Sequence, residues 1–530
     1  MIGIDLGTTY SCASVLNETG ALEIIKNTDN AATTPSAVLI EEDKKVLVGS
    51  SAKNRSKSYA AQKEGFYKGP EGKSGIVTET KRYIGTDKIY DIDGTEYTPT
   101  SISGLILRKI KEDVENAFNK KIDIAVITTP ANFSHQQRQE TLSAAKASGL
   151  KVQHIINEPT AAALAYAIDN KIDGTYAIYD FGGGTFDCTI VKIEGHDVEI
   201  LGSDGVKKLG GTDLDQCLFG LVKKQYKEQM GKNLLRKKYS EVEAEENKIE
   251  LSTSKFFEEY IDDATIKVTR KEFEDEIKLL IGKSLLSFDD ALKNASKKVG
   301  YEIEASDLTD VILVGGTSRV PAVQEAIKEK IGKKPKFYGN PDETVAKGAA
   351  LYVALKNQDA LNMNQKNVIQ VLEIQEITNV YLGHLIRDGS LATSILKNFN
   401  IIEKGSRIPC KKKDLFQLNS WHLSALKNNE RAWLRHQITE SYTDESDKDN
   451  VEVVHVTETD LPTQKEIDYY DYRNIKFQAT YSIDENQIFK SVVTHVESKK
   501  ILYAKELSMK KGTLSGKSAP SDDLDEFNVS

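Results

Sequence analysis

Hydrophobic positions in the first 357 residues alternate between short β-rich runs and longer segments with helical spacing. Three strand-like runs each precede a turn or the start of a helix: 122–129, 176–179 and 311–314. Further on the pattern becomes helical and highly charged, which predicts helices over 223–239 and 241–251 with solvated outer faces. Regular alternation of strands and helices is typical of an α/β architecture.

The pattern changes beyond residue 367. Alternating runs at 451–456 and 475–482 predict half-buried antiparallel strands. The stretch 419–437 holds both tryptophans and has near-helical apolar spacing, so we expect an inserted amphipathic segment that packs against the strands.

These changes divide the chain, and the boundary between its main parts is expected near 361–374. The end of the chain is rich in Ser, Lys, Gly and Asp, which predicts a disordered tail. The resulting order is a first domain, a linker, a β-rich domain and the tail: 1–366, 367–376, 377–500 and 501–530.

Composition narrows the class of protein. A length of 530 residues predicts about three domains or subdomains. The net charge of −9 gives no global footprint for a nucleic-acid backbone, and no apolar run reaches the roughly 18 residues of a membrane span. The first five residues already have the pattern of a strand rather than of a signal peptide. The four cysteines form no metal or redox motif, so we expect a reduced, cytoplasmic compartment. From the charge and the short apolar runs we expect neither nucleic acid nor membrane as partner.

One turn occurs twice in the chain. The segments 2–11 (IGIDLGTTYS) and 178–187 (IYDFGGGTFD) each run from an apolar strand through Asp to Gly and Thr. Glycines at these turns let backbone N–H groups approach phosphate oxygens, and the threonine hydroxyls can donate to the same oxygens. The residues expected at the phosphates are Gly7, Thr8, Thr9, Gly182, Gly183, Gly184 and Thr185.

The acids of this repeat have their own chemistry. Asp5, Asp180 and Asp187 offer hard oxygen ligands for Mg²⁺, which sheds its waters reluctantly and is therefore held partly through them. Asp5 and Asp180 lie 175 residues apart, so the repeat implies two similar lobes that face each other. We therefore predict a Mg²⁺ nucleotide between the two turns.

A third glycine turn follows the apolar run at 310–314. Gly315, Gly316 and Thr317 lie at a helix start, where backbone can take the flat base of a nucleoside, and Arg319 can stack on it. Taken alone, this segment is as readily an ordinary strand-to-helix turn.

Together these motifs resemble the 70-kDa heat-shock chaperone family, whose ATPase domain shares its two-lobed, ribonuclease H-like duplicated fold with actin and the sugar kinases. Further matching segments cover nearly all of the first 357 residues: 81–85 (KRYIG), 155–166 (IINEPTAAALAY), 209–215 (LGGTDLD), 248–252 (KIELS) and 340–350 (NPDETVAKGAA). The resemblance implies an α/β, actin-like ATPase domain followed by a smaller antiparallel β domain.

The resemblance also implies roles for particular residues. Lys81 would lie at the γ-phosphate and orient the attacking water, Glu158 would help to place the water shell of the metal, and Thr185 would join the aspartates around Mg²⁺ and K⁺. The remaining nucleotide-binding residues implied by the family motifs are Tyr10, Gly210, Gly211, Glu245, Lys248, Ser252, Gly316, Thr317, Arg319 and Asp342. Without those motifs, Lys81 beside Arg82 would be typical of an exposed basic pair, and Glu158 of an ordinary helix start.

The chain departs from the family pattern in three places. Ile249 stands where many members carry an arginine over the base, which predicts a weaker grip on adenine. Polar residues interrupt the linker, and burying the charge of Glu373 would cost several kcal/mol, so we expect its docking to be weakened or lost. The segment after residue 500 is shorter than the helical lid of the family, so we expect a lidless member.

The resemblance implies an ATP-dependent chaperone of the stress response, with slow ATP hydrolysis regulating the binding of unfolded polypeptide. J-domain co-chaperones and nucleotide-exchange factors are its expected partners, and ATP or ADP with Mg²⁺ and K⁺ its cofactors. Two alternatives stay open. One is a regulatory member that binds nucleotide without cycling on clients, which the interrupted linker favours; the other is a metabolite kinase of the same fold, which the breadth of the match disfavours.

Overall fold

The computed structural model describes the chain except residues 63–64, 171–172, 196, 370–372, 389–394, 418–432, 443, 445–446, 448–450, 461–475, 497–500 and 507–530. Its described residues form two compact units. The first unit consists of residues 1–133 and 140–374, and the second of residues 134–139 and 375–512.

The first unit contains a mixed sheet that we call the first sheet, in the order β13-β12-β1-β2-β3, with β4 paired to β2. The parallel pairs are β1 with β12 and β12 with β13, and β1, β2 and β3 follow one another antiparallel. Its strands are β1 (Ile2–Asp5), β2 (Tyr10–Leu16), β3 (Leu22–Ile25), β4 (Thr34–Pro35), β12 (Ile124–Thr129) and β13 (Lys151–Asn157).

A second sheet of this unit, the second sheet below, repeats that arrangement in the order β20-β19-β14-β15-β16-β21. Here β14 is parallel to β19 and β19 to β20, whereas β14, β15 and β16 follow one another antiparallel. Its strands are β14 (Gly174–Phe181), β15 (Phe186–Glu194), β16 (Asp197–Val206), β19 (Asp310–Val314), β20 (Lys336–Phe337) and β21 (Ile374–Gln375). The duplicated Asp-Gly-Thr motif therefore lies in two sheets with the same strand order and directions.

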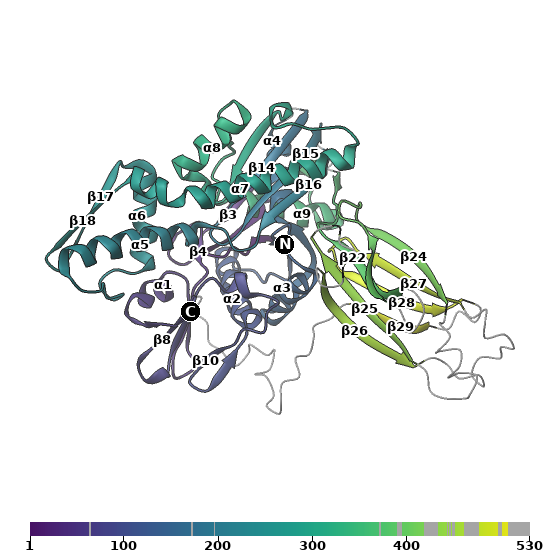
Figure 1. Ribbon diagram of the computed structural model, residues 1–530, viewed down its shortest axis with the longest axis horizontal. Helices are drawn as coiled ribbons and strands as arrows, with labels where there is room; N and C mark the ends of the chain where they lie inside the picture. The colour runs from purple at the N-terminus through teal and green to yellow at the C-terminus, as the bar shows by residue number, and fades with distance from the viewer. Residues whose placement is uncertain are drawn as a thin grey trace. The chain divides into compact units, whose positions relative to one another are not determined.

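Helices pack against both sheets. Helix α7, the longest, crosses β15 and β16 (Figure 1). Helix α9 packs on β1, β2 and β12, and α4 lies against α9. The α-helices are α1 (Ser50–Arg55), α2 (Pro99–Phe118), α3 (His135–Ala147), α4 (Glu158–Asp169), α5 (Gly211–Met230), α6 (Glu241–Thr253), α7 (Arg270–Val299), α8 (Pro321–Ile331), α9 (Thr344–Lys356) and α10 (Met363–Ile369). Short 3₁₀ helices connect them: η1 (Ser56–Ser58), η2 (Pro70–Gly72), η3 (Thr80–Tyr83), η4 (Ala305–Asp307), η5 (Gly316–Arg319) and η6 (Gln358–Ala360).

Smaller β elements complete the first unit. A five-stranded sheet has the order β6-β5-β9-β8-β7, and two hairpins pair β10 with β11 and β17 with β18. The hairpin β17–β18 lies beside α5 and α6 (Figure 1). These strands are β5 (Val38–Ile40), β6 (Val46–Val48), β7 (Ala60–Ala61), β8 (Phe66–Lys68), β9 (Gly75–Val77), β10 (Tyr90–Ile92), β11 (Thr95–Tyr97), β17 (Phe256–Ile261) and β18 (Ala264–Thr269).

The second unit contains two four-stranded antiparallel sheets, in the orders β23-β22-β25-β26 and β24-β27-β28-β29. Alternate residues of β27 are buried and contribute to one apolar cluster, which satisfies the period-2 pattern. The strands are β22 (Tyr381–Asp388), β23 (Ile395–Ile402), β24 (Cys410–Gln417), β25 (Trp433–Ser441), β26 (Glu452–Asp460), β27 (Lys476–Ile483), β28 (Phe489–His495) and β29 (Ile501–Glu506).

Most elements expected from the hydrophobic pattern are confirmed. The runs at 122–129, 176–179 and 311–314 form β12, β14 and β19, and those at 451–456 and 475–482 lie in β26 and β27. The helix expected over 223–239 is wrong in its second half. Helix α5 ends at Met230 because Gly231 takes the left-handed conformation, with φ 66°, and closes the helix.

Two expectations for the second unit are also corrected. Trp433 and the four residues after it lie in strand β25. The near-helical spacing of apolar residues was misleading there, because spacing does not show which strands a segment pairs with. Residues 419–432 lie outside the described residues. The tail expected from residue 501 begins instead with strand β29, which pairs with β28, and residues 507–530 lie outside the described residues.

The described part of the linker shows how Glu373 lies, while the weakened docking expected for this segment stays a prediction. The carbonyl oxygen of Glu373 accepts a hydrogen bond from Val198 N–H at 2.9 Å, and the next residues form β21 at the edge of the second sheet. The side chain of Glu373 stays exposed. Edge-strand pairing uses only backbone groups, so no charge has to be buried when this segment pairs.

Candidate functional site

The three glycine turns converge on one cavity of the first unit, with a volume of about 510 Å³. The turns follow β1, join β14 to β15, and follow β19. Nineteen of the predicted site residues line it: Asp5, Gly7, Thr8, Thr9, Tyr10, Lys81, Glu158, Asp180, Gly182, Gly183, Thr185, Gly211, Glu245, Lys248, Gly315, Gly316, Thr317, Arg319 and Asp342. Four predicted residues lie outside its lining: Gly184, Asp187, Gly210 and Ser252.

The first two turns pack so closely that larger residues would not fit. A Cβ added to Gly183 would lie 2.2 Å from Thr9 Oγ1, and one added to Gly184 would lie 2.5 Å from Thr8 Oγ1. Gly210 packs in the same way against the backbone of Gly183. Gly184 and Gly210 therefore shape the cavity from behind it, and the absence of side chains at these turns lets a phosphate approach the backbone closely.

Three aspartates lie at the floor of the cavity or directly behind it. Asp180 and Asp187 face each other as partners in the β14–β15 hairpin, and Asp5 ends β1 and accepts a hydrogen bond from Thr128 Oγ1 at 3.0 Å. Burial, reinforced by the carboxylate of Glu158, raises the pKa of Asp5 to about 7 and holds the pKa of Asp180 and Asp187 well above the usual range. Several acids packed this closely call for a cationic partner.

Lys81 supplies one positive charge to this group. Its amine meets Glu158 at the N-terminus of α4, and both side chains are almost fully buried. Burial acts to lower the pKa of Lys81, but the carboxylates of Glu158 and Asp5 outweigh it and hold the pKa above the ordinary value. Lys81 is therefore a buried cation aimed at the acidic floor, and the surface-pair interpretation of Lys81 and Arg82 is wrong.

The donor set fits a hydrated Mg²⁺ nucleotide. Asp187 Oδ1 is buried and has no hydrogen-bond partner among the described residues, so an acceptor is left for a water or an ion. In the described part of the chain, no three acidic, histidine or cysteine side chains are close enough to bind a metal directly. Contact through ordered water suits Mg²⁺, and the glycine turns beside the aspartates suit phosphates.

The third turn is tied to the second. The hydroxyl of Thr317 donates to the carbonyl oxygen of Gly182 at 2.8 Å, which joins the two turns across the cavity wall. Gly315 needs its glycine because its φ is 76° and a Cβ would lie 2.5 Å from Phe181 O. Arg319 is held at the mouth by Asn340 Oδ1 and Asp342 Oδ2, each 2.6 Å from its Nη2.

The opposite side of the mouth comes from α6. Lys248 Nζ lies 2.7 Å from Asp215 Oδ1, and Ile249, a residue that is 60% exposed, lines the cavity. Ser252 turns back instead, because its hydroxyl donates to the carbonyl oxygen of Lys248 at 3.3 Å. An apolar side chain and a guanidinium, of Ile249 and Arg319, therefore line the same cavity.

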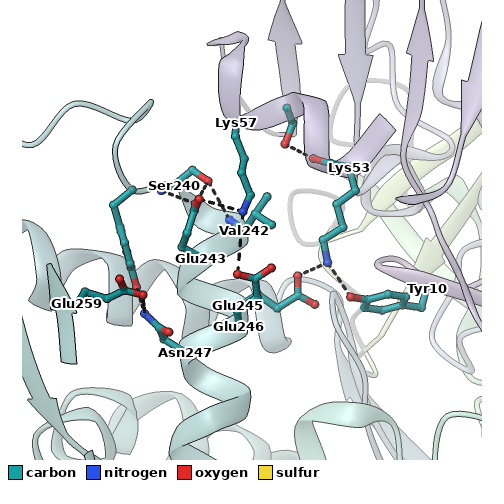
Figure 2. A network of polar contacts seen from close by, with 12 residues as sticks. Tyr10, Lys53, Lys57, Ser240, Val242, Glu243, Glu245, Glu246, Asn247 and Glu259 are labelled. Atoms are coloured by element: carbon teal, nitrogen blue, oxygen red, sulfur yellow. Dashed lines mark hydrogen bonds and ion pairs between the residues drawn. The ribbon is translucent and has the colours of Figure 1, made fainter. Parts of the chain in front are cut away.

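Ion pairs connect α6 with the region around α1. Lys53 pairs with Glu245, and its amine also donates to Tyr10 Oη at 2.7 Å while lying 4.6 Å from the centre of that ring (Figure 2). Burial would raise the pKa of Glu245, but Lys53 and then Lys248 lower it below its ordinary value. Tyr10 is therefore held through Lys53 at the cavity wall.

A second, more exposed pair lies beside the first. Lys57 Nζ is 2.9 Å from Glu243 Oε1 and 4.0 Å from Glu246 Oε2 (Figure 2). Glu243 also closes the capping box at the start of α6 by accepting from Ser240 N–H at 2.9 Å. The start of α6 is thus fixed both by its own cap and by a cation from another segment.

Sequence reasoning missed several residues of this site. Lys53 gives no signal because it lies in a short, charged segment, and its partner is 192 residues away. Asp215 ends a matched motif, but only the fold shows its contact with Lys248. Arg82 is buried against Asp213, 131 residues away, and no local pattern points to that contact.

Among the described residues, no helix combines the length and the apolar content needed to cross a membrane. In a comparison with protein families, the family model described as Hsp70 protein matches residues 1–420.

Proposed function

The chain belongs to the Hsp70 protein family, and from this premise we propose that it is an ATP-dependent chaperone that binds and slowly hydrolyses Mg-ATP to regulate its hold on unfolded polypeptide. The observation that carries the proposal is the cavity itself. Three glycine turns, the buried Asp5 and Asp180 and the Lys81–Glu158 pair meet there, and Asp187 pairs with Asp180 in the β14–β15 hairpin; together they are a donor set for a nucleotide and its cation.

Within this proposal the first unit holds the two-lobed, actin-like ATPase fold. Its support is the repeated strand order of the first and second sheets, each with the Asp-Gly-Thr turn at its central hairpin. The proposed domain bounds are 1–366 for the ATPase and 367–376 for the linker. The two antiparallel sheets after it would form the substrate-binding domain, at 377–500, with β29 extending it.

Phosphoryl transfer to water depends mainly on positioning and on charge neutralisation. When bound, Mg²⁺ would neutralise phosphate charge and carry ordered waters; Asp5, Asp180 and Asp187 would hold it, with Thr185 nearby and K⁺ as a second cation. Backbone N–H groups of Gly7 and Gly183 and the hydroxyls of Thr8 and Thr9 would bind phosphate oxygens, while the Gly182 N–H closes its own turn by donating to the carbonyl oxygen of Thr185 at 3.1 Å. Arg319, Asp342, Lys248 and Ile249 would surround the nucleoside.

Lys81 has the central part in hydrolysis under this proposal. Its buried amine would face the terminal phosphate, stabilise the charge that develops there and orient the attacking water. Glu158 fixes the direction of that amine, since the two side chains pair at the cavity wall and both are almost fully buried. This division of roles requires no covalent intermediate.

The regulatory alternative is weakened at one point. It rested on polar residues that interrupt the linker, and one of them, Glu373, keeps its side chain exposed while its backbone is paired. We therefore favour a member that still cycles on clients, with J-domain proteins and exchange factors as its expected partners.

Peptide binding under two nucleotides tests the proposal. The affinity for a fluorescent unfolded peptide would be measured with Mg-ADP and with Mg-ATP, using the Lys81→Ala variant to keep ATP intact. We expect at least about a tenfold weaker affinity with ATP, in line with a coupling free energy between sites. Equal affinities would favour the regulatory alternative.

A further inference from the structure

The guanidinium of Arg82 is an enclosed charged group beside the cavity, and the proposed chemistry gives it no part. Its side chain is 7% exposed. Its Nε donates to the carbonyl oxygen of Gly184 at 3.0 Å, and its two terminal nitrogens pair with the carboxylate of Asp213, Nη1 lying 3.4 Å from Oδ1. A forked guanidinium bound at three points is a geometrically specific contact rather than a loose surface pair.

These partners belong to the second-sheet side of the cavity. Gly184 lies in the turn between β14 and β15, packed against Thr8. Asp213 lies in the first turn of α5, where its Oδ2 accepts from Gly210 N–H at 2.8 Å. Arg82 itself precedes β12 and sits in η3, beside α2. The guanidinium thus joins η3 to the glycine turn and to the helix start that shape the cavity from the other side.

The geometry of η3 links Arg82 to its neighbour Lys81. A 3₁₀ helix has three residues per turn, so consecutive side chains point about 120° apart. In η3 this directs Lys81 to Glu158 and Arg82 to Gly184 and Asp213. Movement of the Arg82 anchor would therefore rotate or shift Lys81.

The start of η3 also needs an external hold. Glu79, which caps it, has a left-handed backbone with φ 55°, although it is not glycine. Its Oε2 lies 3.5 Å from Arg82 Nη1. A backbone in this region persists only when surrounding contacts fix it, and Arg82 supplies such a contact.

We propose that Arg82 is a positioning residue: through Gly184 and Asp213 it holds η3, and with it Lys81, in the hydrolytic position only while the two sides of the cavity are together. The inference rests on the proposed ATPase function. It adds that closure of the cavity around the nucleotide and the positioning of Lys81 occur together. The reason is that Arg82, which contacts the far side of the cavity, and Lys81 are neighbours in the same turn of η3.

A purely structural role for Arg82 makes a different prediction. If the guanidinium only held the two sides of the cavity together, its loss would weaken nucleotide affinity and leave the rate at which bound ATP is hydrolysed unchanged. If it positions Lys81, the rate at saturation falls and the Lys81 amine becomes accessible even without nucleotide. The experiment therefore needs both readouts.

The full-length protein would be compared with three variants: Arg82→Ala, Arg82→Lys and Asp213→Asn. Arg55→Ala is the matched control, since it breaks an exposed ion pair with Glu41 away from the cavity. Single-turnover hydrolysis at saturating Mg-ATP gives the rate, and ADP titration gives the affinity. Amine labelling of the nucleotide-free protein, quantified by mass spectrometry for Lys81, gives accessibility, with Lys271, 81% exposed, as internal standard.

For Arg82→Ala we expect the single-turnover rate to fall at least about tenfold, as small displacements of a catalytic group do, and Lys81 labelling to rise several-fold over wild type. Arg82→Lys keeps the positive charge but loses the two-nitrogen contact with Asp213, so its rate and its Lys81 labelling should lie between those of the wild type and Arg82→Ala. Asp213→Asn keeps the shape of the helix start and should lower the rate and raise the labelling, as Arg82→Ala does. Wild-type labelling and rate in Arg82→Ala and Asp213→Asn would overturn the inference. Absence of hydrolysis by the wild type would instead contradict the proposed function, while the labelling result would still decide whether Arg82 holds Lys81.

Discussion

Lys81 and Glu158 meet inside the cavity although they lie 77 residues apart, with 4% and 9% of their side chains exposed. Three further acids, Asp5, Asp180 and Asp187, surround this pair. Removing one partner of a buried pair leaves an uncompensated charge, so the pair is a sensitive point of the structure. Its position beside the glycine turns makes it the centre of the proposed hydrolysis.

Replacement of Lys81 by alanine should separate binding from hydrolysis. The phosphate-binding backbone stays intact, but the cation that orients water is gone, so we expect the single-turnover rate to fall by about 100-fold or more while ADP affinity changes little. Lys271→Ala, an exposed lysine on α7, is the control and should behave as wild type. Hydrolysis retained by Lys81→Ala would refute the role given to Lys81.

Replacement of Lys53 should loosen the grip on nucleotide. Its amine holds both Tyr10 and Glu245 at the cavity wall, and each of these would lose its partner. We expect Lys53→Ala to release ADP about tenfold faster, equivalent to about 1.4 kcal/mol. Lys57→Ala, whose pair is more exposed, should change release much less; equal effects of the two would argue against a specific role for Lys53.

Ile249 predicts a test of base recognition. Its exposed apolar side chain lines the cavity that also contains Arg319, and a bound base would cover it. Ile249→Arg should tighten ATP binding several-fold through a cation–π contact worth about 1 kcal/mol, without changing the affinity for inorganic triphosphate. Calorimetry with both ligands checks this. A parallel gain for triphosphate would show that only added charge was measured.

Glu79 predicts how stability depends on pH. Burial is the main cause that raises the pKa of Glu79 to about 7. The charge of Arg82 lowers this pKa, and the carboxylate of Asp213 raises it further. Because the native state keeps this proton longer than the unfolded chain, the stabilisation is present at low pH and is lost as the pH rises from about 4.5 to about 7.

The Glu79→Gln variant isolates that contribution. It retains the size of the side chain but cannot titrate, so between pH 5 and pH 8 it should lose about 1–3 kcal/mol less unfolding free energy than wild type, at about 1.4 kcal/mol per pKa unit. Denaturant unfolding of the nucleotide-free protein at both pH values measures this. Glu71→Gln, an exposed control, should follow the wild type, and an unchanged slope for Glu79→Gln would disprove the assignment.

The parts of the site that sequence predicted are those determined by local backbone chemistry. Glycine beside Asp and Thr marks a turn that admits phosphate wherever it occurs, so the turns at Gly7, Gly183 and Gly315 could be located without a fold. Strands such as β12 and β19 were equally predictable from the sequence, because an uninterrupted apolar run is typical of a strand buried on both faces.

The parts that were missed depend on contacts between distant segments. Arg82 with Asp213 and Lys53 with Glu245 join residues 131 and 192 positions apart, and a charged residue whose partner is unknown looks like solvated surface. The conformation of the linker was not predictable for a related reason. The sequence shows the charge of Glu373 but not that edge pairing leaves that side chain in solvent.

The most direct test of the account is the rate at which a stoichiometric complex of the wild-type protein with Mg-ATP forms ADP, measured with and without an unfolded peptide. The account predicts slow hydrolysis by the protein alone and a several-fold faster rate with peptide, because polypeptide binding and the cavity would be coupled through the linker paired at β16. Absence of hydrolysis, or a rate that peptide leaves unchanged, would contradict it.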